Sequence, residues 1–133
     1  MLDAAFAGQV HTDFAVLTKA IREGFLPDTI STDLTKNSAY KRGGRYGLPL
    51  CMSMARTAGM AEADIFRSVT TAPADALGQP WGRLSVGGVA DIAVLAYENE
   101  GFSFTDNAGN TFASDNGYRC KLTVADGVVL FRD

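Results

Sequence analysis

Apolar residues recur with a helical period near the start of the chain. Phe14, Leu17 and Ile21 stand three and four positions apart, which predicts an amphipathic helix over residues 13–23. Gly24 follows at once and supplies a natural stop.

The next stretch, "PDTISTDLT", predicts a strand that ends on a carboxylate. Pro27 breaks the preceding helix, because proline disfavours helix for the residue before it. Thr29, Ile30 and Thr32 are β-branched and favour a strand over "TISTDL". We therefore expect Asp33 at the carboxyl end of this strand.

Three more helices are expected before the pattern changes from helical to strand-like. Residues 35–47 are polar and glycine-bearing without periodicity, which is typical of a loop. A helix follows over "LPLCMSMARTAG", with Pro49 in its first turn, and another over "AEADIFRSVT". Thr71 is expected to cap a short third helix, "APADALG".

After Trp81 the pattern predicts strands, arranged as three hairpins. "GRLSV" and "ADIAVLAY" flank Gly87-Gly88-Val89, and "GFSFT" and "NTFAS" flank "DNAGN". "CKLTVA" and "VVLF" flank Asp126-Gly127, a pair that favours a tight type I′ turn. The chain is thus predicted to be rich in helices up to about Gly78 and rich in strands afterwards.

Composition narrows the class of protein. The 133 residues suffice for one small domain, and an apolar fraction of 47% can form a core. A net charge of -3 gives no support for a nucleic-acid-binding surface. No run approaches the ~18 apolar residues of a membrane span, and the start lacks the features of a signal peptide. We expect a soluble cytoplasmic protein without nucleic-acid or membrane partners.

The two cysteines and the single histidine suggest no site of their own. Cys51 and Cys120 fit no metal-ligand spacing and are expected to be reduced, with Cys51 packed in an apolar helix. His11 has no Cys, Asp or Glu at ligand spacing and is expected to be exposed or to cap the first helix. Asp91 is expected to hydrogen-bond the preceding glycine turn.

Asp33 allows two interpretations from the residues alone. In a parallel α/β barrel, ligands and catalysis gather at the carboxyl ends of strands, where an aspartate can bind a metal or accept a proton. Alternatively, Asp33 caps the following loop, because aspartate is common in turns. The residues alone slightly favour the capping role.

Four segments change that balance: "GFLPDTISTDL", "TTAPADALG", "GRLSVGGVADIAVL" and "TVADGVV". Together they resemble the C-terminal part of the metal-dependent amidohydrolases. The resemblance runs from about Asp13 to Asp133 and is nearest to the dihydroorotase-like deacetylase branch. It implies an α/β plus β fold, in which residues 1–80 form the C-terminal slice of a (β/α)8 barrel. Residues 81–133 then contribute strands to a small β-sandwich.

The same resemblance implies a role for Asp33. The family aspartate at this position ends the eighth strand, ligates a metal and carries the proton of the attacking hydroxide. The implied cofactor is one or two divalent metal ions, with zinc expected. The other family ligands are an H-x-H pair, a lysine carboxylate and two further histidines, which His11 cannot supply. The chain is therefore expected to be an inactive C-terminal fragment of an enzyme that hydrolyses an amide, cyclic amide or ester.

Two departures from the family pattern concern its substrate pocket. Thr35 stands where family members often have histidine, and the family's Gly-His-Gly pattern is not recognisable in "LDAAFAGQVH". Either the substrate differs or this end of the sequence is degraded.

Basic residues crowd the loop after Asp33. Arg42 and Arg45, with Lys36 and Lys41 nearby, are candidates to bind a substrate carboxylate, which arginine grips with two parallel hydrogen bonds. A solvated loop is the stronger interpretation of these charges.

A different class of function also stays open: a non-catalytic α+β module that serves only in assembly. In either case, the strands are expected to leave unpaired edges and uncovered apolar faces, which drive self-association. The residues expected to need a partner are Ile30, Leu50, Phe66, Val94 and Leu95. A homo-oligomer is therefore predicted.

Overall fold

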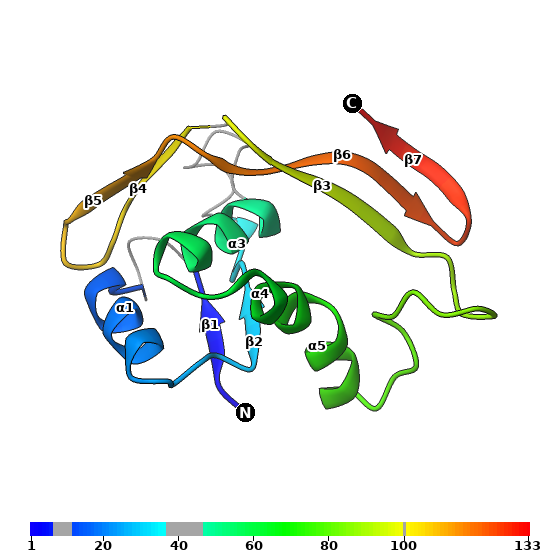
Figure 1. Cartoon of the computed structure of the whole chain (residues 1–133), viewed down its shortest axis with the longest axis horizontal. Coiled ribbons are helices and arrows are strands. Elements are labelled where there is room, and N and C mark those ends of the chain that lie inside the picture. Colours follow the sequence, from blue (N-terminus) through cyan, green and yellow to red (C-terminus); the bar gives the residue numbers. More distant parts are fainter. Residues whose placement is uncertain (7–11, 37–46, 100) are drawn as a thin grey trace.

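A computed structural model gives the arrangement of the chain (Figure 1). It describes residues 1–6, 12–36, 47–99 and 101–133. His11, Lys41, Arg42 and Arg45 lie outside these residues.

The first part of the chain is a β–α–β unit. Strands β1 (Asp3–Ala5) and β2 (Thr29–Ser31) pair in parallel, and helix α1 (Phe14–Arg22) lies between them in the chain. The predicted helix is confirmed: the carboxylate of Asp13 accepts the N–H of Val16, at 3.0 Å, and so caps its start. Parallel strands need such a crossover, because a tight turn can join only antiparallel ones.

Three helices follow, as predicted: α3 (Leu48–Thr57), α4 (Glu62–Val69) and α5 (Thr71–Ala76). The prediction that Thr71 caps α5 is wrong, because the helix already includes Thr71 and the N-cap position belongs to Thr70. The Thr70 hydroxyl donates back to the carbonyl of Phe66, at 2.6 Å, so it satisfies the end of α4 and not the start of α5.

The strand-rich part contains two antiparallel units. Strands β3 (Ile92–Glu98), β6 (Gly117–Ala125) and β7 (Val128–Arg132) form a sheet in the order β3-β6-β7. Strands β4 (Phe102–Thr105) and β5 (Thr111–Ser114) form a hairpin. The second and third predicted hairpins are therefore confirmed. Asp126 and Gly127, with φ of 47° and 77°, form the tight turn between β6 and β7.

The first predicted hairpin is wrong, because residues 82–86 form no strand. This segment is instead held against α5: Arg83 pairs with Asp75, and a Cβ on Gly82 would lie only 2.5 Å from the carbonyl oxygen of Thr70. Residues 82–86 thus lie against α5, whereas β3 pairs with β6. The glycine turn between them still forms, and the N–H of Gly88 donates to Ser85 O.

The hydrophobic core is built mainly from helices α1, α3 and α4 and strand β2, with single residues from β4 and β6. Strands β3 and β6 arch over α3 and α4 (Figure 1). Cys51, Met54 and Ile65 are fully buried, which confirms the predicted packing role of Cys51. Cys51 and Cys120 are not joined by a disulfide. Within the described part of the chain, no helix is long and apolar enough to cross a membrane.

Polar side chains also join the helices to the sheet. The buried Ser53 hydroxyl donates to the carbonyl of Pro49, at 2.7 Å, and accepts the backbone N–H of Tyr118, at 2.8 Å. The Arg56 guanidinium donates to the Tyr118 hydroxyl, at 2.8 Å, and lies 3.1 Å from the carboxylate of Glu62. Burial raises the pKa of the Tyr118 hydroxyl, and the hydrogen bond that Arg56 donates to Tyr118 raises the pKa of Arg56.

The β4–β5 hairpin is tied to the start of α1 by a buried carboxylate. Asp106 accepts the backbone N–H groups of Asn110, Ala108 and Phe14, at 2.9, 3.0 and 3.4 Å. Burial alone would raise the pKa of Asp106, but these hydrogen bonds, led by those from Asn110, hold it below its usual value. The ring of Phe14 packs on Phe112, with 4.4 Å between centroids. The hairpin and α1 therefore form one packed unit.

The residues expected to need a partner are partly covered by this chain itself. Ile30 is buried, and Leu50, Phe66 and Leu95 are half-buried against the core. Val94 is 45% exposed. The predicted homo-oligomer stays a prediction.

Candidate functional site

The carboxyl ends of β1 and β2 meet at one edge of the parallel pair. The register pairs Ala5 with Ser31, and the N–H of Phe6 donates to the carbonyl of Ser31, at 3.0 Å, just beyond the last pair. Thr12 donates its hydroxyl back to Ala5 O, at 3.3 Å. The segments that leave the two strands therefore start side by side.

Asp33 lies at this edge, two residues beyond the strand. The predicted strand over "TISTDL" is too long, because β2 ends at Ser31. The Thr32 hydroxyl accepts the N–H of Leu34, at 3.2 Å, and such a local bond competes with strand pairing. Asp33 itself has φ of 46°, a left-handed conformation that is uncommon outside glycine but tolerated by aspartate. The chain therefore turns sharply at an exposed carboxylate.

The two faces of β2 differ in chemistry. Ile30 points into the core formed with the helices. Thr29 and Ser31, on the opposite face by the period of a strand, donate their hydroxyls to the carboxylate of Asp3, each at 2.6 Å. The face of β2 opposite Ile30 thus carries a polar cross-link just before Asp33.

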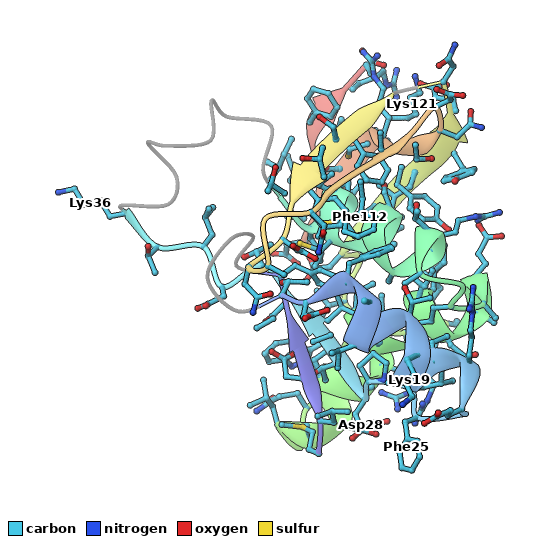
Figure 2. All side chains as sticks on the ribbon, turned by 90° about the vertical axis from the view of Figure 1, so that its left-hand side faces the viewer. Lys19, Phe25, Asp28, Lys36, Phe112 and Lys121 are labelled. Atoms are coloured by element: carbon cyan, nitrogen blue, oxygen red, sulfur yellow. The ribbon has the colours of Figure 1, made fainter. Side chains whose placement is uncertain are left out.

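The basic residues are only partly placed. Lys36 is exposed, and the segment that leads to it runs away from the body of the molecule (Figure 2). Arg42 and Arg45 lie outside the described residues, so their role in substrate binding stays a prediction.

The carboxylate of Asp33 could serve a metal only as one donor of a larger set. In the parts of the chain that the structure describes, no three His, Cys, Asp or Glu side chains gather closely enough to hold a metal ion. A catalytic zinc site uses about three protein ligands. Any metal at Asp33 would therefore need ligands from outside the described residues.

A separate apolar cavity of about 470 Å³ lies between the helices and the sheet. Its lining includes Met52, Phe66 and Leu95, and Asp33 is not among the residues around it. Asp91, at its rim, accepts the N–H of Asp126, at 2.8 Å. Asp91 thus binds the turn between β6 and β7 and not the predicted glycine turn. This contact is structural, as the sequence predicted.

Sequence reasoning missed β1 and its Asp3. The strand has only three residues, and aspartate and alanine are depleted in strands. No local signal in "MLDAAF" indicates either the strand or the cross-link that Asp3 makes to β2.

Comparisons with known proteins show one family and two similar structures. Residues 8–130 match the model of the amidohydrolase family. The chain is similar to the crystal structure of an adenine deaminase, with 30% identity and a TM-score of 0.79 over 91% of this chain and 33% of that one. It is also similar to the crystal structure of a dihydroorotase, with 26% identity and a TM-score of 0.81 over 95% of this chain and 34% of the other. The chain spans about a third of the length of these two proteins. No curated protein matches it in sequence.

Proposed function

Because the chain belongs to the amidohydrolase family, we propose that it is the C-terminal part of a metal-dependent enzyme that hydrolyses a carbon–nitrogen bond. The observation that carries this proposal is the position of Asp33, just beyond a parallel strand and at the edge where β1 also ends. Catalytic groups gather at this edge in parallel barrels.

The proposed architecture assigns residues 1–80 to the end of the barrel and residues 81–133 to the small β-sandwich. The β–α–β unit of β1, α1 and β2 supports the first assignment, since it repeats the building unit of such a barrel. The antiparallel sheet β3-β6-β7 supports the second.

Asp33 would serve both as a ligand and as a proton carrier. When bound, a divalent metal, with zinc expected, lowers the pKa of water and so supplies a nucleophile at neutral pH. The carboxylate of Asp33 would accept the proton of the attacking water and deliver it to the leaving nitrogen, so that the amide bond breaks to an acid and an amine. Its exposure and the turn at its backbone leave it accessible for this task.

The proposal also covers substrate binding, cellular location and the activity of the 133-residue chain alone. Arg42 and Arg45 would bind a carboxylate of a small amide, cyclic amide or ester substrate. The whole enzyme would work in the cytoplasm. The 133-residue chain by itself would be inactive, because only Asp33 is a credible ligand in it.

A non-catalytic assembly module is the rival proposal. It is favoured by the core, in which Ile30 of β2 is buried by this chain alone, so the piece can pack without the rest of a barrel.

The test compares the 133-residue chain with a longer protein that carries it as its C-terminal part. Both are assayed against amides, cyclic amides and esters with added zinc. We expect metal-dependent turnover by the longer protein and none above background by the chain alone. Turnover by the chain alone, abolished in Asp33→Asn, would contradict the fragment proposal. A longer protein that binds no metal and hydrolyses nothing would favour the assembly module.

A further inference from the structure

We propose that Asp3 is a positioning residue, which fixes the end of β2 and thereby the carboxylate of Asp33. The inference rests on the proposed function of Asp33. It concerns the side-chain cross-link between the two parallel strands.

The cross-link is well defined in its geometry. Asp3 stands opposite Thr29 in the parallel register, and its two carboxylate oxygens each accept one hydroxyl. Oδ1 accepts from Thr29 and Oδ2 from Ser31, both at 2.6 Å, which is the short range of charge-assisted hydrogen bonds. Both hydroxyls must donate here, because an ionised carboxylate only accepts.

Both partners of Asp3 lie on the strand that leads to Asp33. Ser31 is the last residue of β2, and Asp33 follows two residues later, where the backbone turns with φ of 46°. β1 and β2 have only three residues each, so few backbone hydrogen bonds hold them together. The two side-chain bonds of Asp3 therefore add to the backbone pairing and to the packing of Ile30 in fixing the direction of β2 as it reaches Asp33.

This arrangement makes Asp3 a support and not a ligand. Both of its oxygens already accept hydroxyls from the neighbouring strand. Residues that orient a metal ligand or a catalytic group typically change affinity or activity by about 10- to 100-fold when removed, since small misplacements are costly.

The chain offers a matched control in Asp28. Its carboxylate also joins the two strands, accepting the N–H of Leu2 at 2.8 Å, but at their amino ends. Figure 2 shows Asp28 at the lower end of the molecule, away from the segment that leads to Lys36. Asp28→Ala therefore removes a similar bond between the same strands without touching the end that carries Asp33.

The experiment measures kcat and KM of the longer protein for wild type, Asp3→Ala, Asp3→Asn and Asp28→Ala. We expect Asp3→Ala to lower kcat by about 10- to 100-fold with KM within about twofold of wild type, because a misplaced proton carrier impairs the reaction step and not binding. Asp3→Asn should recover most of kcat, since its amide can still bond both hydroxyls after they rotate. Asp28→Ala should leave kcat within about twofold of wild type.

A second readout is independent of activity. Amide hydrogen exchange in the 133-residue chain should quicken at Phe6, whose N–H binds Ser31 O, in Asp3→Ala and not in Asp28→Ala. If Asp3→Ala fails to fold, Ser31→Ala removes one donor instead and should reproduce part of both effects.

The outcomes separate the inference from the function on which it rests. Equal losses of kcat in Asp3→Ala and Asp28→Ala, or unchanged exchange at Phe6, would overturn the positioning role while the enzyme stays active. A wild-type longer protein without any turnover would refute the proposed function itself, and the inference with it.

Discussion

The hydroxyl of Ser53 is expected to be a main polar connection between the helices and the sheet. Ser53 is 1% exposed, and its oxygen both donates to Pro49 O and accepts the N–H of Tyr118. β7 pairs with β6 only from Leu122 onward, so it does not reach residue 118. Ser53 thus occupies the place that a neighbouring strand would take.

Ser53→Ala removes this acceptor without changing the helix, because alanine is the best helix former. The buried N–H of Tyr118 then lacks a partner, which costs about 1–3 kcal/mol of the free energy of unfolding. Small domains are stable by only about 5–15 kcal/mol in total, so a loss of this size is readily measured.

The assay is urea unfolding at one fixed protein concentration, with Thr57→Ala as the matched control. Thr57 makes the same kind of bond in the same helix, donating to Ser53 O at 2.9 Å, but its side chain is exposed. Its loss should stay within about 0.5 kcal/mol. Amide exchange at Tyr118 should quicken only in Ser53→Ala. Equal stability of the two variants, with slow exchange at Tyr118 in both, would refute this reasoning.

Three other predictions concern the rest of the fold. Folding lowers the pKa of Asp106. The stability that its carboxylate contributes is therefore fully present above the ordinary pKa of 3.8 and is lost as the pH falls through the lower pKa of the folded state. In urea unfolding, the midpoint of Asp106→Asn should fall less on acidification than the midpoint of wild type. β7 is an edge strand with exposed apolar side chains, so sedimentation should find the 133-residue chain as an oligomer that Leu130→Lys weakens, and a monomer at micromolar concentration would contradict this. Gly82→Ala should lower the melting temperature by several degrees, because a Cβ would clash with Thr70 O and φ is 72°, whereas an unchanged melting temperature would show that residues 82–86 do not rest on α5.

Strong local patterns predicted the helices and two hairpins. α1 combines helical spacing with a capping aspartate and a terminal glycine, so local preferences suffice to define it. The Asp126-Gly127 turn likewise follows from residues that tolerate positive φ.

The errors come from interactions between distant segments. Residues 82–86 alternate as a strand does, but alternation does not specify a partner, and contacts with α5 hold this segment instead. β1 was missed because three residues of poor strand propensity are held by pairing with β2 and by the side chain of Asp3. The site was predictable only through Asp33, since its support by Asp3 depends on a register that no local pattern reveals.

The central claim is that this chain contributes Asp33 to the catalytic site of a longer hydrolase. The most direct measurement is the turnover of that longer protein with Asp33→Asn. Asparagine has the same shape and also tolerates the left-handed backbone at this position, so the fold should stay intact. We predict that kcat falls by a factor of about 10² to 10⁴, while the melting temperature stays close to that of wild type. A variant that folds and keeps more than about half of the wild-type turnover would contradict the account and leave Asp33 as a loop cap.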